Sequence, residues 1–455
     1  MHPNSRRQFL KQSALVSLGF IALSRCKSAG SEEVVSPSLT LQSDPENYLD
    51  LPEGFDYKII SRAGQSMTDG FLVPGRPDGM GAFEGPDGQV LLVRNHENSP
   101  MPAENSPFGI DQGLLSKLQP EQLYDFGQAR QPGLGGTTTL VYNEATGEVE
   151  REFLSLAGTY RNCAGGVTPW NSWLTCEEDV TKKEDLVEQD HGYVFEVPAT
   201  ADPALAEPRP IRAMGRFNHE AVAVDPNTGI VYQTEDRHDG LIYRYLPDQP
   251  GNLHAGGRLQ ALVVVDRPGL DTRNWEERTM KVGESVEVTW IDVTDIDAPD
   301  DDLRFRGFAD GAARFARGEG MWWGDGECYF ACTNGGPKRF GQVFRLRPAA
   351  DGPGKNDQLE LFAESPDKTV LHACDNLTVA PWGDVILCED NGERNYIRII
   401  NQQGQIFDFG CNRSSSSEFA GLVFSPSGKT LFVNIQENGD TLAITGDWDR
   451  LQQFS

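Results

Sequence analysis

The chain has 455 residues, roughly three ordinary domain lengths, so it has room for one large domain or for two to three smaller ones. Hydrophobic residues make up 38% and charged residues 24%, which is typical of a globular protein, so a disordered chain is not expected. The formal net charge of −28 would repel a phosphate backbone, so no nucleic-acid partner is expected. The carboxylate excess is either an ordinary solvated surface or a store of oxygen ligands for hard cations.

Residues 1–30 have the pattern of an export signal. Arg6-Arg7 precedes an apolar run over 14–23 and a short polar spacer, which is typical of a twin-arginine signal peptide read by the twin-arginine translocase. This apolar run is too short to span a bilayer, and no later stretch approaches the roughly 20 residues needed. We expect a periplasmic or extracellular protein whose mature form has no transmembrane segment, with a linker over 31–50.

Leu23-Ser24-Arg25-Cys26 offers a second interpretation of this terminus, lipoprotein anchoring through Cys26. Arg25 stands where a lipoprotein cleavage site has a small residue, which counts against it. Twin-arginine export carries folded proteins, so a metal ion can be loaded before the chain leaves the cytoplasm. The signal therefore gives a reason to look for a metal site in the mature chain.

Beyond residue 50 the chain repeats one pattern six times, a turn followed by a β-rich run that ends in acids or amides. These segments lie at 85–98, 169–179, 225–237, 323–336, 381–392 and 425–439. Turns such as Asp87-Gly88 and Ser427-Gly428 between apolar runs are typical of β-hairpins. We therefore predict an all-β fold, a six-bladed β-propeller over 51–455 with loop insertions at 99–135, 180–213 and 247–302.

In a hairpin, the start of the first strand lies beside the end of the second. A step of fifteen residues back from each acid-rich strand end pairs Cys163 with Glu178, Glu220 with Glu235, Glu319 with Asn334, and Asp375 with Asp390. The same step from Glu97 and Gln436 reaches Ala82 and Gly421, so those two repeats offer one candidate each. In a closed ring of hairpins these groups would converge on one central mouth.

Converging carboxylates repel one another or take up protons, so the pattern predicts bound cations. Oxygen ligands suit Ca²⁺ or Mg²⁺, whereas a thiolate at Cys163, close to Gly165 and Gly166, favours an additional softer metal such as iron. The alternative is that individual acids at strand ends, Glu97 and Glu178 among them, are turn residues that face water.

Several segments, taken in chain order, resemble the PhoX-type alkaline phosphatases. They are Arg94-Asn95-His96-Glu97, Asn162-Cys163-Ala164-Gly165-Gly166, Leu174-Thr175-Cys176-Glu177-Glu178, Gly215-Arg216-Phe217-Asn218-His219-Glu220, Thr234-Glu235-Asp236-Arg237 and Arg317-Gly318-Glu319-Gly320. The resemblance runs from about residue 50 to about residue 440. It implies a six-bladed propeller with Fe³⁺ and Ca²⁺ in its mouth, and hydrolysis of phosphate monoesters, so small phosphorylated compounds are the implied substrates.

The resemblance also implies roles for single residues. Cys163, Glu178 and Glu220 correspond to ligands at or near iron. The implied ligands on the calcium side are Glu97, Glu319, Glu389 and Asp390. Arg317 corresponds to the guanidinium that grips phosphate, with Glu319 beside it in the catalytic site and Arg237 and Arg161 as weaker candidates for substrate binding.

Two other functions stay open at this point. A calcium-dependent lactonase on the same architecture would need a single calcium ion and no thiolate. A non-enzymatic propeller would bind a protein or glycan through its insertions, and its central mouth would not matter.

Overall fold

A computed structural model of the chain describes residues 39–349, 352 and 354–452. The predicted signal peptide over 1–30, with Arg6-Arg7 and Cys26, lies outside the described residues. Within the segment predicted as a linker, β1 (Leu41–Gln42) pairs with β2 (Leu49–Pro52). Among the described residues, no helix has the length and apolar character needed to cross a membrane.

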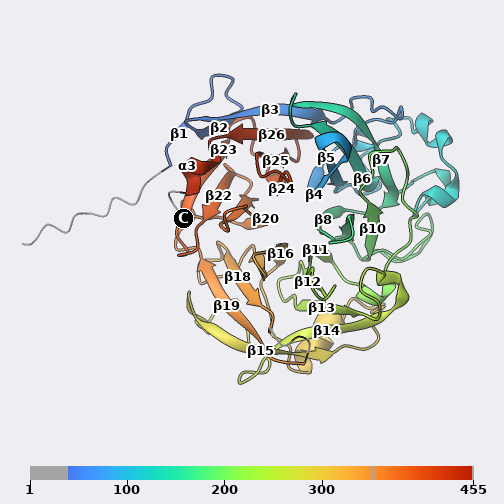
Figure 1. The fold of residues 1–455 in the computed structure, drawn as a ribbon. Helices are drawn as coiled ribbons and strands as arrows, with labels where there is room; N and C mark the ends of the chain where they lie inside the picture. Colours follow the sequence, from blue (N-terminus) through green and yellow to red (C-terminus); the bar gives the residue numbers. More distant parts are fainter. Residues whose placement is uncertain (1–38, 350–351, 353, 453–455) are drawn as a thin grey trace, which may run out of the picture. The chain divides into compact units, whose positions relative to one another are not determined.

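The strands form five antiparallel sheets (Figure 1). One sheet contains β4 (Pro77–Glu84), β5 (Gln89–His96), β6 (Gly135–Asn143) and β7 (Glu148–Thr159), and the next contains β8 (Asn162–Val167), β9 (Ser172–Glu177) and β10 (Val194–Pro198). A third has the order β1-β2-β23-β22-β21-β20, with β20 (Cys374–Val379), β21 (Val385–Glu389), β22 (Tyr396–Ile400) and β23 (Ile406–Asn412). A fourth joins β24 (Phe419–Phe424), β25 (Thr430–Ile435) and β26 (Asp440–Gly446) to β3 (Phe55–Arg62).

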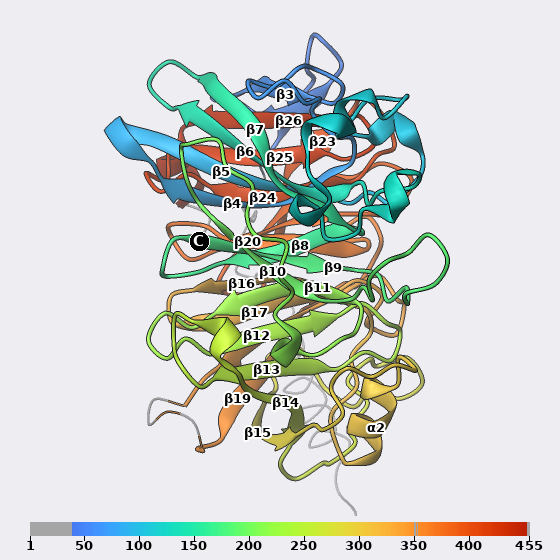
Figure 2. The same cartoon turned by 90° about the vertical axis from the view of Figure 1, so that its right-hand side faces the viewer.

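The fifth sheet has nine strands in the order β11-β12-β13-β14-β15-β19-β18-β17-β16. Figure 2 shows β11 to β15 following one another down one side of the molecule. The bounds are β11 (His219–Val224), β12 (Val231–Glu235), β13 (Ile242–Pro247), β14 (Gly257–Val264), β15 (Ser285–Asp292), β16 (Gly318–Gly324), β17 (Glu327–Cys332), β18 (Gln342–Arg347) and β19 (Asp357–Glu364). β14 and β15 fall inside the predicted insertion over 247–302, so much of that insertion is sheet.

Helices are short and lie between strands or at the end of the described chain. The α-helices are α2 (Leu303–Ala309) and α3 (Trp448–Leu451). The 3₁₀ helices are η1 (Pro86–Gly88), η2 (Ala103–Asn105), η3 (Gly113–Lys117), η4 (Pro120–Gln122), η5 (Gly127–Ala129), η6 (Arg212–Met214) and η7 (Leu253–Ala255). Four of the 3₁₀ helices, η2 to η5, occupy the predicted insertion over 99–135.

The innermost strands surround the centre of the molecule. β4 contacts β8, β8 contacts β11, β11 contacts β16, β16 contacts β20, β20 contacts β24, and β24 contacts β4, so the contacts form a closed cycle (Figure 1). The predicted all-β, propeller-like arrangement is confirmed, and each predicted repeat segment contains one second strand: β5, β9, β12, β17, β21 or β25. The predicted number of six separate blades is not confirmed, because β15 pairs with β19 and merges two groups of strands into one sheet.

Burial follows the position of each strand in its sheet. β11 and β24 are buried along their whole length, because neighbouring elements cover both faces. In β3, at the edge of its sheet, exposed Asp56 and Lys58 alternate with the partly buried Phe55 and Tyr57. Apolar side chains fill the space between sheets, so the inner strands have a rigid support.

Glycines let the inner strands of neighbouring hairpins approach closely. A Cβ atom on Gly166 in β8 would lie 2.2 Å from the carbonyl oxygen of Val222 in β11, and one on Gly320 in β16 would lie 2.7 Å from Cα of Asn376 in β20. Both neighbours are backbone atoms, so they cannot turn aside as a flexible side chain would. The close approach of the inner strands therefore depends on these glycines.

We expect Gly166→Ala to destabilise the protein by about 1–3 kcal/mol, because the added methyl group overpacks the contact between β8 and β11. Chemical denaturation of the wild type and the variant measures this difference. Gly113→Ala is the control, since the atoms nearest to its added Cβ belong to the side chain of Asp111, at 3.1 Å or more. Equal midpoints for all three proteins would show that the inner strands have room to move apart.

Candidate metal centre

One backbone hydrogen bond recurs at the same end of six hairpins. The N–H of the residue after the second strand donates to the carbonyl of the residue before the first strand. The pairs are Glu97 to Arg76, Glu178 to Arg161, Asp236 to Asn218, Thr333 to Arg317, Asp390 to Ala373 and Gln436 to Glu418, with N···O distances of 2.9–3.3 Å. Each bond fixes both chain segments at the same edge of a sheet, so side chains from all six hairpins meet.

These side chains line a cavity of about 260 Å³, which we call the central cavity. Its described lining has nine carboxyl groups, one thiol and three guanidinium groups. The lining residues are Arg76, Asp78, Glu97, Arg161, Cys163, Glu178, Glu220, Asp236, Arg317, Glu319, Thr333, Asp375, Asp390, Glu418 and Gln436. Such a set of ligand atoms, drawn from all the inner hairpins, can hold more than one cation.

Four groups in this lining have ligand atoms within 4.8 Å of one another. They are Glu97 with Cys163 and Glu178; Asp78 with Glu97 and Glu418; Glu220 with Glu319 and Asp375; and Asp375 with Asp390 and Glu418. Glu97, Asp375 and Glu418 each occur in two groups, so the groups are linked by shared carboxylates. Shared carboxylates are suited to bridging neighbouring cations.

Burial and mutual repulsion make ionisation of this cluster costly. Burial, followed by the charge of Glu97, raises the pKa of Asp78 from 3.8 to about 8. Burial, followed by the charge of Asp236, raises the pKa of Glu178 from 4.5 to about 8. Burial also raises the pKa of the Cys163 thiol well above its ordinary value, with Asp78 and Glu220 adding to the effect. Without cations, several of these groups would keep their protons at neutral pH.

The three arginines occupy the same position in three hairpins, directly before the first strand. Arg76, Arg161 and Arg317 have φ angles of 47°, 46° and 51°, a left-handed conformation that is rare for a residue with a side chain. Each arginine precedes an inner strand and lines the central cavity, where its guanidinium lies among the carboxylates. The arginines offset part of the negative charge.

Arg161 and Arg317 keep donors free for a further anion. Nη2 of Arg161 lies 2.6 Å from Oε1 of Glu97 and also contacts Glu178, while its Nε is buried without a hydrogen-bond partner among the described residues. Arg317 donates from Nε and Nη2 to the two carboxylate oxygens of Asp236, at 2.7 and 2.8 Å. Its Nη2 lies 2.8 Å from Oε1 of Glu319, and in the described part of the chain its Nη1 makes no hydrogen bond.

Glu177, the residue before Glu178, belongs to a separate buried network. Its Oε1 lies 2.6 Å from Nδ1 of His191, and Nε2 of His191 lies 3.3 Å from Oδ2 of Asp125. Burial lowers the pKa of His191, but the charge of Glu177 and the hydrogen bond to Asp125 outweigh it and raise the pKa to about 9. Asp125 and His191 come from two different predicted insertions, so the network fastens both loops to the strand end that precedes the central cavity.

Two observations indicate that the lining of the central cavity is suited to metal ions. Oε2 of Glu220 and Oε1 of Gln436 are buried and have no hydrogen-bond partner in the described part of the chain, although a buried oxygen without a partner is costly. The donor set combines carboxylate oxygens, which prefer hard cations, with one thiol, which prefers a softer metal. Of the seven cysteines described, Cys163 alone is partly exposed, and the other six are buried.

The structure brings most of the predicted site residues together. Those that line the central cavity are Glu97, Arg161, Cys163, Glu178, Glu220, Arg317, Glu319 and Asp390. Arg237 lines a neighbouring pocket that also includes Arg161 and Glu178. Glu389 lies apart: its Oε1 accepts hydrogen bonds from Nε of Arg398 at 2.8 Å and from the N–H of His372 at 2.9 Å. An arginine and backbone amides thus already satisfy the Glu389 carboxylate.

Sequence reasoning missed Asp78, Asp236, Glu418 and Arg76 as lining residues, and it gave Asp375 only as a partner of Asp390. The fixed step of fifteen residues fails for two hairpins, where the residues that come together are Asp78 and Glu97, and Glu418 and Gln436. The first of these hairpins is longer, and Glu418 lies directly before β24 rather than within it, so a step of fifteen reaches the wrong residue in both. An acid near the start of each predicted first strand is the signal that would have found them.

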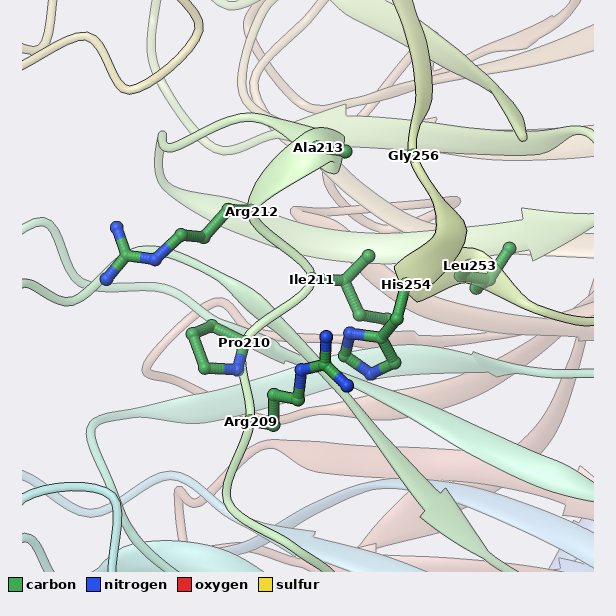
Figure 3. Close-up of a pocket in the computed structure, with 8 residues that line it drawn as sticks. All are labelled: Arg209, Pro210, Ile211, Arg212, Ala213, Leu253, His254 and Gly256. Atoms are coloured by element: carbon green, nitrogen blue, oxygen red, sulfur yellow. The ribbon is translucent and has the colours of Figure 1, made fainter. Parts of the chain in front are cut away.

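A separate pocket of about 350 Å³ differs in character (Figure 3). Its lining includes Arg209, Ile211, Arg212, Leu253 and His254. Figure 3 shows Arg209 and His254 pointing toward one another and Arg212 pointing away. None of the described residues that line it carries a carboxylate or a thiol, so it does not offer the ligand set found in the central cavity.

Comparison with models of known protein families gives a match across nearly the whole chain. The family described as Alkaline phosphatase PhoX matches residues 38–439. No curated protein sequence matches the chain.

Among solved structures, a gluconolactonase from Xanthomonas campestris has a TM-score of 0.40 and 12% identity, over 91% of this chain and 99% of that one. A periplasmic gluconolactonase from Pseudomonas aeruginosa has the same TM-score and identity, over 86% of this chain and 92% of that one. Virginiamycin B lyase from Staphylococcus aureus has a TM-score of 0.38 and 12% identity, over 86% and 99% of the two chains. These distant similarities carry no information about activity.

We expect chelator-treated protein to lose stability as the pH rises from about 4 to about 8. The folded chain holds protons on Asp78 and Glu178 up to a pKa of about 8, whereas the unfolded chain releases them near 4. Stability contributed by these protons is therefore lost as the pH passes through that window. Added Ca²⁺ should remove this loss, because a cation stabilises the ionised carboxylates. Melting curves at several pH values measure this loss of stability. Melting temperatures that neither chelator nor Ca²⁺ changes would contradict the metal centre.

Proposed function

Because the chain belongs to the alkaline phosphatase PhoX family, and is therefore a phosphate-ester hydrolase, we propose that it hydrolyses phosphate monoesters in the central cavity. The observation that carries this proposal is the meeting of linked carboxylate groups, one thiol and two arginines with free donors in one small cavity. A protein with a net charge of −28 can attract a phosphate only where cations overcome that charge.

We propose Fe³⁺ and Ca²⁺ as the cations. Cys163 with Glu178 and Glu97 would hold the softer metal, and Glu220, whose charge also acts on the Cys163 thiol, is a further candidate ligand. The oxygen groups built on Asp78, Glu319, Asp375, Asp390 and Glu418 would hold calcium. Cations held there would supply Lewis-acid chemistry: they would polarise the phosphoryl oxygens and make phosphorus more electrophilic.

The arginines then orient the phosphate. Asp236 holds the Arg317 guanidinium by two hydrogen bonds, and this arrangement leaves Nη1 as the donor for an equatorial phosphate oxygen. Glu319 fixes the same guanidinium from a second side. Nε of Arg161 is a further donor, and it has no other partner in the described residues. Donors fixed before substrate binds stabilise the charge that develops in the transition state without reorganisation.

We further propose that the hairpins form six blades within one domain over 51–455. The recurrence of the closing backbone hydrogen bond and the closed cycle of inner strands support this number. The sequence pattern over 1–30 supports export through the twin-arginine translocase to the periplasm or outside, with lipidation at Cys26 as the alternative.

Cys163→Ser tests the metal centre most directly. A thiolate on Fe³⁺ gives a visible charge-transfer band, so we expect a coloured wild type. The variant, with a harder oxygen, should lose colour, iron and phosphatase activity. Metal analysis, absorption spectra and hydrolysis of p-nitrophenyl phosphate measure the three effects.

Cys176→Ser is the matched control, because Cys176 is buried in β9 and does not line the central cavity. The Cys176→Ser variant should keep its bound metals and should be only modestly less stable than the wild type. Full activity and metal content in Cys163→Ser would overturn the thiolate assignment. Calcium without iron in the wild type would favour a calcium-only lactonase, and absence of bound metal would favour a binding propeller.

Arg317→Lys should keep the fold and lower kcat/KM by roughly 10- to 1,000-fold, because lysine cannot both hold Asp236 through two donors and present a third to phosphate. Steady-state kinetics measure the loss, and circular dichroism and metal content report whether the fold and the metals are kept. A rate equal to that of the wild type would remove Arg317 from the site.

A further inference from the structure

A second hollow of about 390 Å³ adjoins the central cavity, and we call it the side pocket. Its lining residues are Arg161, Glu178, Asp179, Val180, Thr181, Asn218 and Arg237. Arg161 and Glu178 line both spaces, so the two hollows are contiguous across these side chains. An ester whose phosphate lies in the central cavity beside Arg161 would extend its alcohol group into the side pocket.

The walls of the side pocket are polar nearly throughout. Arg237 supplies donors, Asp179 supplies acceptors, and the Thr181 hydroxyl can do both, whereas the Asn218 amide already donates to Glu178 and to the carbonyl of Asp236. Val180 is the one apolar residue, and there is no aromatic ring, in the described lining of this pocket. An aromatic alcohol would find no surface to stack on, whereas hydroxyl groups would meet donors and acceptors on several sides.

Arg237 has capacity for a ligand. Its Nη1 donates to the carbonyl of Asp236 at 3.3 Å, and its Nη2 makes a long contact of 3.5 Å with Oδ2 of Asp301. Its Nε makes no hydrogen bond among the described residues, and its side chain is 30% exposed. Thr181 likewise has a hydroxyl that makes no hydrogen bond in the described part of the chain. Both groups can bond to a ligand without giving up a strong contact.

We propose that the side pocket binds the alcohol portion of the substrate and selects phosphate monoesters of polyhydroxylated alcohols, such as sugars and glycerol. This proposal rests on the proposed function. Arg237 and Thr181 are its specificity residues, because each offers an unused donor to a hydroxyl group. Asp179 accepts from the N–H of Thr181 at 2.6 Å, which holds this segment in place and leaves its other oxygen for a ligand hydroxyl.

The test compares selectivity rather than absolute rate. For metal-loaded wild type, Arg237→Met and Thr181→Val, kcat/KM is measured with glucose 6-phosphate and with phenyl phosphate, which lacks hydroxyl groups on its alcohol. The ratio of the two values should fall by about 5- to 10-fold in each variant, the effect of one lost hydrogen bond to a bound hydroxyl. Methionine and valine keep most of the side-chain volume, so packing is little changed.

Arg258→Met is the matched control, since Arg258 is 63% exposed, pairs with Asp292 and lies outside both hollows. Its selectivity ratio should equal that of the wild type. A wild-type ratio in both pocket variants, with the two rates falling together or not at all, would overturn the side-pocket proposal while leaving the phosphatase proposal intact. A wild type that hydrolyses neither ester would overturn both.

Discussion

The structure depends on how one small volume accommodates like charges. Nine carboxyl groups and a thiol share about 260 Å³ with three guanidinium groups. Two like charges 4 Å apart repel by about 4 kcal/mol at the effective dielectric constant of a protein surface, and burial makes each charge costlier still. The three arginines balance only part of this negative charge, so protons or cations must supply the remaining positive charge. In a family of phosphatases, cations in such a cavity would have two effects: they would neutralise the carboxylates, and they would attract the phosphate of the substrate.

The backbone holds these groups against their mutual repulsion. Each hairpin is closed by the same hydrogen bond at the edge of the central cavity, and glycines such as Gly166 and Gly320 let the inner strands lie close together. Arg161 and Arg317 have left-handed backbone conformations, which are energetically unfavourable, and their guanidinium groups lie among the acids. Rigid strands and their hydrogen bonds, rather than loops, therefore define the geometry of the site.

The sequence predicted the second strand of every repeat, because turn residues and β-rich runs are local signals. It also predicted Cys163, Glu220 and Glu319 from a constant step along the hairpin. The same step chose Glu178 over Glu177 correctly, but it chose Glu235 where Asp236 lines the cavity, because the hairpins differ in length and successive side chains of a strand point to opposite sides. Glu177, Glu235 and Glu389 end in structural contacts with His191, Arg304 and Arg398. Their neighbours Glu178, Asp236 and Asp390 line the cavity.

The pairing of β3 with β26 bears on how the protein is made. Residues 55–62 form the outer strand of a sheet whose other strands lie between residues 419 and 446. The pairing of these two strands cannot form during synthesis until residues 440–446 have left the ribosome. The groups of acids that contain Glu418 join it to residues as early as Asp78, so they assemble only after residue 418 has been made. A product truncated before Glu418 lacks part of the lining of the central cavity, so cation binding there would require a chain that extends beyond this residue.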